Sequence, residues 1–176
     1  MYKVLDGGLL GFEWWHMAKK IVWRTDGRLF EPGDEMTSAG DHALTSLNAG
    51  HAPTEQAFRD GIPNGHDLRA NSLYTWRDES WARWTWDHEP DKFLYKLEID
   101  EDETRHTGDV CWYSAAGTLI GEGKSPAEAV DAYAISQPHI QDQHYKPRVE
   151  ILVKRATVLE RYEKKSRNGP CGLGTG

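Results

Sequence analysis

The stretch that decides the fold reads Lys146-Pro147-Arg148-Val149-Glu150-Ile151-Leu152-Val153. Its last three residues form a continuous apolar run rich in β-branched side chains, which predicts a buried strand, and Pro147 stands where the start of a strand tolerates proline. Glu150 immediately precedes the apolar run. Because a carboxylate is costly to bury without a partner, Glu150 lies either at the rim of this strand or is held there for a purpose.

The 176 residues are enough for one domain with a substantial core. Charged residues make up 28% of the chain and hydrophobic residues 38%, which indicates a folded, soluble class rather than a disordered one. The formal net charge of -7 argues against a surface that binds nucleic acid over its whole extent, but it is compatible with a local basic groove. No run approaches the roughly 18 apolar residues of a membrane span. We therefore expect a cytoplasmic monomer, in the host or in a target cell, that does not engage membranes.

The cysteine and histidine positions offer no metal or disulfide framework. Cys111 and Cys171 are a single pair without zinc-ligand spacing, so we interpret both as free thiols in a reducing compartment. His139, Asp142 and His144 are close in sequence, but no predicted helix places them on one face. We predict that the protein uses no metal.

The patterning of apolar residues predicts mostly strands with short helices between them, which is typical of an α+β fold. Besides the stretch around Glu150, strands are predicted at residues 20–25, 72–76, 93–99 and 156–162, with a further short strand at 110–113. Helical turns are predicted at residues 53–59, after a cap at Asp78, and from the capping-box pattern at Ser125 to about Tyr133. Residues 37–52, 61–65 and 100–109 are expected to be loops or connections.

Three strand residues carry chemistry: Arg24 in Val22-Trp23-Arg24-Thr25, Tyr74 in Ser72-Leu73-Tyr74-Thr75-Trp76, and Glu150. Taken singly, each has an ordinary explanation, as a surface cation, a core tyrosine and a solvated carboxylate at the end of a strand. Their order along the chain is what makes them worth considering together.

In that order, these residues resemble the motifs of the ADP-ribosyltransferase superfamily over residues 20–162. Val22-Trp23-Arg24-Thr25 resembles an early motif of an aromatic residue followed by Arg or His. The segment Leu29-Phe30-Glu31-Pro32-Gly33-Asp34 is similar to the one that follows this motif in rifamycin-type transferases.

The later motifs continue the resemblance. Leu73-Tyr74-Thr75, followed by the Trp81-Ala82-Arg83-Trp84 helix, resembles the middle motif, and residues 93–99 resemble the strand that comes next. Val149-Glu150-Ile151-Leu152-Val153 is similar to the glutamate strand of DarT-type toxins that modify DNA. The resemblance implies a split β-sandwich of two small sheets around an NAD cleft, with short flanking helices. The resemblance implies a catalytic domain at residues 20–163. The apolar segment at residues 12–17 predicts that an N-terminal extension, residues 1–19, packs on this domain, and the basic, then glycine-rich residues 164–176 predict a flexible tail.

The resemblance implies that NAD is a substrate and that its ADP-ribose is transferred. Attack at the carbon bearing nicotinamide passes through an oxocarbenium-like state, as at other glycosidic centres. A carboxylate bonded to the ribose stabilises that charge and orients or deprotonates the acceptor, and we assign this catalytic role to Glu150. Tyr74, with Trp76 as an alternate, would stack on the nicotinamide ring.

The remaining cofactor-binding candidates are cationic or adjoin the first motif. Arg24, with its neighbour Thr25, would anchor the adenosine ribose or the pyrophosphate of NAD. Arg69, in the polar loop expected before the Tyr74 strand, is a further candidate for a phosphate contact.

Arg148 is the candidate on the acceptor side. Many relatives carry Glu or Gln two positions before the motif glutamate, whereas this chain carries Arg148. A cation there would repel an arginine acceptor and favours an anionic one, so we favour nucleic acid over protein, with a small-molecule drug also open. The middle motif lacks Ser-Thr-Ser, which points to the tyrosine-bearing branch. The implied function is a mono-ADP-ribosyltransferase, as a toxin or a phage or bacterial effector. The alternatives are an NAD glycohydrolase and a non-catalytic module that binds a nucleotide or a partner.

Overall fold

The apolar run becomes strand β6 (Val149–Val153), which is buried along its whole length in a computed structural model that describes residues 18–40, 51–140 and 146–164. Alternate residues of a strand point to opposite faces of the sheet. Val149, Ile151 and Val153 join the core on one face, and Leu152 joins a second core on the other. A strand covered on both faces reads as a continuous apolar run, so this prediction is confirmed.

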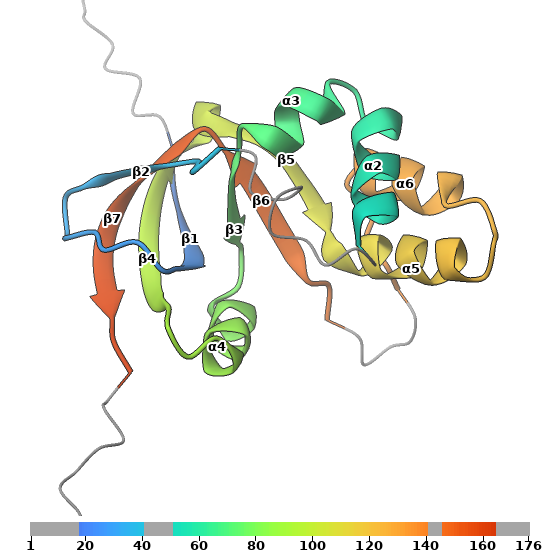
Figure 1. The fold of residues 1–176 in the computed structure, drawn as a ribbon. Coiled ribbons are helices and arrows are strands. Elements are labelled where there is room, and N and C mark those ends of the chain that lie inside the picture. The colour runs from blue at the N-terminus through green and yellow to red at the C-terminus, as the bar shows by residue number, and fades with distance from the viewer. Residues whose placement is uncertain (1–17, 41–50, 141–145, 165–176) are drawn as a thin grey trace, which may run out of the picture.

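Around β6 the described strands form one antiparallel sheet, in the order β2-β7-β4-β1-β3-β6-β5 (Figure 1). With five helices beside this sheet, the expected α+β class is confirmed. The other strands are β1 (Lys19–Asp26), β2 (Glu35–Thr37), β3 (Leu73–Trp76), β4 (Phe93–Asp100), β5 (Thr104–Asp109) and β7 (Arg155–Tyr162).

The sheet is continuous, so the expectation of two separate small sheets is wrong for the described part of the chain. Strands β1 and β4 pair along eight positions, whereas β1 and β3 pair at a single position, Trp23 with Trp76. This single pair is enough to keep the sheet continuous, because Trp76 also pairs with Glu150 on its other side. Strand β3 therefore joins two halves that the motif pattern alone treats as independent.

The helices are distributed unevenly over the sheet (Figure 1). Four of them gather beside β5 and β6, where they cover the face to which Leu152 points. The remaining helix, α4, packs against β1, β3 and β4. The bounds are α2 (Ala52–Gly61), α3 (Gly65–Ala70), α4 (Glu79–His88), α5 (Val110–Gly121) and α6 (Ala127–Ala134), with a short 3-10 turn at Glu101–Glu103.

The predicted strand at residues 110–113 is wrong, because this segment is the first turn of α5. A short apolar run does not distinguish a strand from a buried helical segment. The helix is started by Asp109, whose side-chain Oδ1 accepts a hydrogen bond from the Cys111 backbone N–H at 3.0 Å. Such a cap stabilises a helix end by satisfying an otherwise unpaired donor.

Two segments expected as irregular are regular. Residues 104–109 form the edge strand β5, and residues 65–70 form helix α3. The sequence of β5 is polar and carries no strand signal of its own. Its strand geometry comes from pairing with β6, which residues 104–109 alone do not reveal. Helix α3 is short and buries Leu68 and Arg69, so tertiary packing rather than propensity stabilises it.

The other predicted elements are confirmed within a residue or two at each end, except that α4 extends further, to His88. The proposed N-terminal extension up to residue 17 and the tail from residue 165 lie outside the described residues, as do Cys171, Asp142 and His144. Within the described residues, no helix has the length and apolar character needed to cross a bilayer.

Candidate active site

The three strands that carry the sequence motifs are neighbours in the sheet, in the order β1, β3, β6. Trp76 on β3 is the register partner of Trp23 on β1 and, on its other edge, of Glu150 on β6. Arg24 follows Trp23 directly. The fold therefore brings the early, middle and late motifs into one row across the sheet.

The side chains of this row are divided between two faces. Glu150 alternates with Val149 and Ile151 and so shares the helix-covered face with Leu152. Tyr74 packs against the same helix-covered core. Trp23 packs against Ala82 of α4, on the same face as its register partner Trp76. Because neighbouring residues of a strand point to opposite faces, Arg24 points to the other face of the sheet. The sheet brings Glu150 and Tyr74 to one side and leaves Arg24 on the other.

Glu150 is nearly enclosed, with 8% of its surface exposed. Its Oε1 accepts a hydrogen bond of 2.5 Å from the Tyr133 hydroxyl on α6, and Nη1 of Arg69 lies 3.9 Å away. Burial raises the pKa of Glu150, and the positive charge of Arg69 and the Tyr133 hydrogen bond oppose that rise. A carboxyl with a raised pKa and a specific cation beside it is typical of a functional site.

Arg69 lies at the centre of this enclosed cluster, with 5% of its surface exposed. Its Nε donates to both carboxylate oxygens of Glu55, at 2.9 and 3.0 Å, and Nη1 donates to the Tyr133 hydroxyl at 3.4 Å. Its guanidinium lies 5.3 Å from the centre of the Tyr74 ring. In this arrangement the cation proposed for a phosphate of NAD is engaged by Glu55.

Tyr74 is held by the same cluster. Its hydroxyl donates to the Arg69 carbonyl at 2.7 Å. Burial raises the pKa of Tyr74 well above its usual value, so the phenol stays protonated. Its ring is half-buried and packs against the helical core, so stacking on nicotinamide would use the part of the ring that remains exposed.

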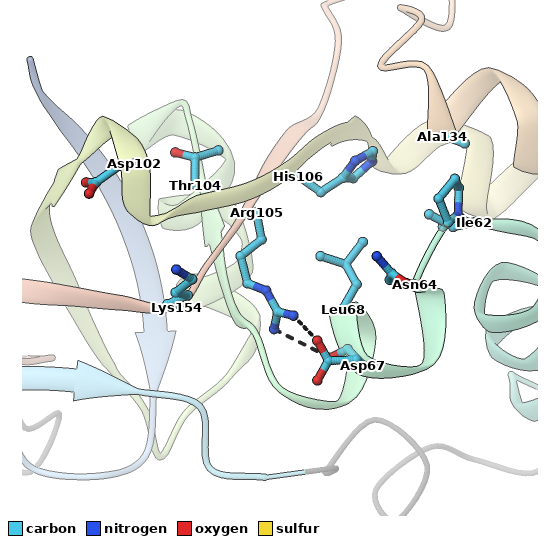
Figure 2. Close-up of a pocket in the computed structure, with 11 residues that line it drawn as sticks. Ile62, Asn64, Asp67, Leu68, Asp102, Thr104, Arg105, His106, Ala134 and Lys154 are labelled. Atoms are coloured by element: carbon cyan, nitrogen blue, oxygen red, sulfur yellow. Dashed lines mark hydrogen bonds and ion pairs between the residues drawn. The ribbon is translucent and has the colours of Figure 1, made fainter.

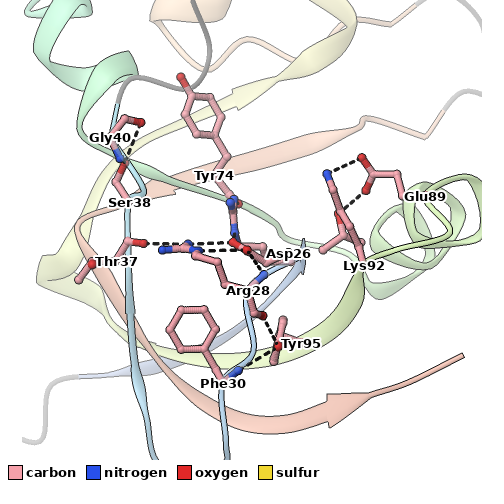
Figure 3. A network of polar contacts seen from close by, with 12 residues as sticks. Asp26, Arg28, Phe30, Thr37, Ser38, Gly40, Tyr74, Glu89, Lys92 and Tyr95 are labelled. Atoms are coloured by element: carbon pink, nitrogen blue, oxygen red, sulfur yellow. Dashed lines mark hydrogen bonds and ion pairs between the residues drawn. The ribbon is translucent and has the colours of Figure 1, made fainter. Parts of the chain in front are cut away.

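Arg24 belongs to a polar network on the opposite face. Its Nε donates to Asp26 at 2.9 Å and its Nη1 donates to the Tyr74 carbonyl at 2.6 Å. Burial disfavours an ionised Asp26, but hydrogen bonds from Arg28 and the charge of Arg24 outweigh it and lower its pKa. Figure 3 shows Asp26 and Arg28 beside the backbone of Tyr74, whose ring points away from them. Arg24 thus reinforces the single-pair junction between β1 and β3.

The remaining predicted residues lie around this row. The Thr25 hydroxyl donates to Glu89 at 2.8 Å. Trp76 is half-buried and packs with the α4 core. Arg148 donates from Nε to the Cys111 sulfur at 2.9 Å and from Nη2 to Ser114 at 3.1 Å. Its guanidinium also lies 5.6 Å from the centre of the Trp81 ring, so Arg148 joins β6 to α5 and α4.

Gly108 on β5 is the register partner of Glu150 and makes room for Tyr133. A Cβ atom at this position would lie 2.3 Å from Cε2 of the Tyr133 ring. That ring is further confined by Phe58 and His106, whose ring centres lie 5.0 and 4.9 Å from its own. Only a glycine lets the tyrosine approach β5 closely enough to reach Glu150.

Gly108→Ala is therefore expected to lower the free energy of unfolding by about 1–3 kcal/mol, because the added methyl overpacks a confined ring. Urea unfolding followed by tryptophan fluorescence measures the change. Gly121→Ala is the matched control, since nothing lies within 4 Å of its added Cβ. The control is expected to be neutral or to stabilise by up to about 1 kcal/mol. Equal losses in both variants would contradict the importance of the Tyr133 contact.

Three members of this cluster were missed from the sequence: Glu55, Gly108 and Tyr133. An isolated glycine in a strand signals a close approach of another group, but residues 104–109 were not recognised as a strand. Glu55 and Tyr133 lie on predicted helices and carry no local signal. Only the packing of α2 and α6 on β6 brings them to Glu150.

A cavity of about 420 Å³ lies away from this row, beside the edge strand β5 (Figure 2). Arg105 points across it to Asp67, with which it forms an ion pair, and donates to Ser72 at 3.1 Å. None of the sequence-predicted site residues lines it. The lining residues are Ile62, Pro63, Asn64, Asp67, Leu68, Asp102, Thr104, Arg105, His106, Ala134 and Lys154.

Comparison of the chain with protein-family models and with curated proteins finds no match in either set. In the described ranges, no group of three or more His, Cys, Asp or Glu side chains is arranged to hold a metal ion. The functional argument therefore rests on the geometry of the row itself.

Proposed function

We propose that the protein is an NAD-dependent mono-ADP-ribosyltransferase with Glu150 as its catalytic carboxylate. The observation that carries this proposal is the double register of Trp76, which pairs with Trp23 on β1 and with Glu150 on β6. The three motifs that resemble the superfamily thereby come from three adjacent strands, with Glu150 and Tyr74 on the same face of the sheet. An ADP-ribosyltransferase-like fold remains part of the proposal, with its two halves joined into one sheet through the single pair between β1 and β3.

The chemistry follows from the residue types. The bond between the nicotinamide nitrogen and the ribose carbon breaks, and nicotinamide leaves with the electron pair. An acceptor atom then bonds to that carbon and gives up its proton. Glu150 would stabilise the positive charge that develops on the ribose and take up the acceptor's proton. Burial raises the pKa of Glu150, which makes its carboxylate a stronger base toward the acceptor's proton.

The acceptor side of the proposal rests on Arg148. Arg148 lies two residues before Glu150 in the chain, and its guanidinium contacts the Cys111 sulfur and the Trp81 ring. An anionic acceptor, nucleic acid before protein, fits its charge better than a cationic one. Arg24 would contribute by bracing β1 against β3, because its Nη1 is bonded to the Tyr74 carbonyl.

A second candidate is a non-catalytic binding module. It is favoured by the enclosure of Glu150, whose carboxylate is already bonded to Tyr133 and lies beside Arg69. A carboxylate held in this way can serve stability alone.

Incubation with NAD labelled in its adenylate part, together with separate pools of single-stranded DNA, RNA and protein, distinguishes these functions. The proposal expects release of nicotinamide and transfer of label to one macromolecular pool, the DNA or RNA pool before the protein pool. Release of nicotinamide with free ADP-ribose as the sole labelled product would indicate a glycohydrolase. An unchanged NAD pool in all three mixtures would contradict both activities and favour the binding module.

A further inference from the structure

Tyr133 on α6 makes the shortest contact of the Glu150 carboxylate, and nothing in the sequence motifs points to it. We propose that Tyr133 is a positioning residue for Glu150: its hydroxyl holds Oε1, so that Oε2 is the oxygen presented to the ribose or the acceptor. The inference rests on the proposed function and adds to it the device that orients the catalytic carboxylate.

The direction of the hydrogen bond follows from the protonation of Tyr133. Burial, and then the negative charge of Glu150, raise the pKa of Tyr133 well above its usual value, so the phenol keeps its proton and is the donor. Oε1 receives this proton donor at 2.5 Å and has Nη1 of Arg69 at 3.9 Å. No hydrogen bond joins Oε2 to the described part of the chain, so one oxygen is held and the other is left for a ligand.

The charged and titratable groups around Glu150 come from every element packed against it. Arg69 and the hydroxyl of Tyr133 favour the ionised carboxylate, whereas the negative charges of Glu55 and Asp109 disfavour it. The phenols of Tyr74 and Tyr113 stay protonated, since burial raises the pKa of Tyr74 well above its usual value and that of Tyr113 to about 12. The Tyr133 hydrogen bond therefore acts together with the charge of Arg69 to hold down the pKa of Glu150, against burial and the two neighbouring carboxylates.

The tyrosine is fixed in place independently of Glu150. Its ring is fully buried between Phe58, His106 and the backbone of Gly108, where the absence of a side chain makes room for it. A donor that is already fixed by packing can orient a carboxylate without an entropic cost at the moment of reaction. This distinguishes Tyr133 from a surface partner that would have to be ordered with the substrate.

Tyr133→Phe removes the hydroxyl and keeps the ring. We expect the kcat of NAD consumption to fall about tenfold or more while the KM for NAD changes little, because a misdirected carboxylate impairs the reaction rather than binding. The hydrogen bond lowers the pKa of Glu150, so its removal raises that pKa. The acid limb of the pH–rate profile should therefore move to higher pH, so that activity is lost at a higher pH on acidification.

Tyr113→Phe is the matched control, because Tyr113 is a half-buried phenol of the same cluster that lies over Phe58 and faces Glu55. Its acid limb should remain where the wild type has it. An active wild type whose acid limb is unmoved in Tyr133→Phe overturns this inference and leaves the proposed function standing. A wild type that consumes no NAD overturns both.

A second measurement needs no folded Tyr133→Phe protein. In the wild type, the side-chain carboxyl carbon of Glu150, assigned in NMR spectra by comparison with Glu150→Gln, is followed through a pH titration. The ring carbon that bears the Tyr133 hydroxyl should shift with the same midpoint, because its hydrogen bond weakens as Glu150 is protonated. Titration of Glu150 without a response of Tyr133 overturns the inference.

Discussion

Glu150→Gln is expected to reduce NAD consumption by about 10²–10⁴-fold, the range usually lost with a general base. The amide keeps an oxygen that can accept from Tyr133 at the position now held at 2.5 Å. It cannot carry the negative charge that would stabilise the ribose or accept the proton. The variant should remain folded, because Arg69 keeps its ion pair with Glu55. Nicotinamide release and thermal unfolding, measured on the same preparation, check both statements.

Glu98→Gln is the control for this substitution, since Glu98 is a carboxylate on β4 paired with Lys19 at 2.5 Å near the surface. It should consume NAD at the wild-type rate. A Glu150→Gln variant that retains wild-type turnover would remove Glu150 from the mechanism. A variant that is unfolded would instead identify Glu150 as a structural carboxylate and favour the binding module.

Arg69→Met is expected to lower the free energy of unfolding by about 3–5 kcal/mol, the usual cost of removing one partner from a buried ion pair. The methionine matches the length of the aliphatic part. It leaves Glu55 paired with Arg59 and removes the Arg69 cation that lies 3.9 Å from Glu150. It also removes the cation beneath the Tyr74 ring. Urea denaturation followed by far-UV circular dichroism measures this loss.

Arg77→Met is the matched control, because Arg77 pairs with Asp78 at 3.3 Å and its side chain is 53% exposed. Exposed pairs contribute little, so the control should change the unfolding free energy by no more than about 0.5 kcal/mol. A loss below about 1 kcal/mol in Arg69→Met would mean that the cluster relaxes around the missing cation, contrary to the buried network described above.

The confirmed predictions share a strong local signal. The run of residues 151–153 predicts a buried strand, because consecutive apolar side chains leave neither face of a strand polar. The helix beginning near Ser125 was signalled by a proline at its start, and its Ala127 N–H is bonded to the Ser125 hydroxyl at 3.3 Å. Both depend on residues that are neighbours in the chain.

The missed elements lack such a signal. Strand β5 is polar and glycine-containing, and it is a strand because β6 supplies its hydrogen-bonding partner. Helix α3 has six residues and is stabilised by burying Leu68 and by the Arg69–Glu55 ion pair. The expectation of a second sheet was wrong for the same reason. The one pair between Trp23 and Trp76 joins the two halves, and neither strand's sequence signals this pairing.

The sequence by itself determined the α+β class, the strands bearing Arg24, Tyr74 and Glu150, and the resemblance on which the proposed reaction rests. These follow from side-chain size, polarity and spacing, which act over a few residues. Only the tertiary structure decided that Arg24 lies on the face opposite Glu150, that Arg69 is engaged by Glu55, and that Tyr133 reaches Glu150 past Gly108. The physical reason is that the charge and orientation of a buried group depend on partners brought by other elements, here the helices packed on β6.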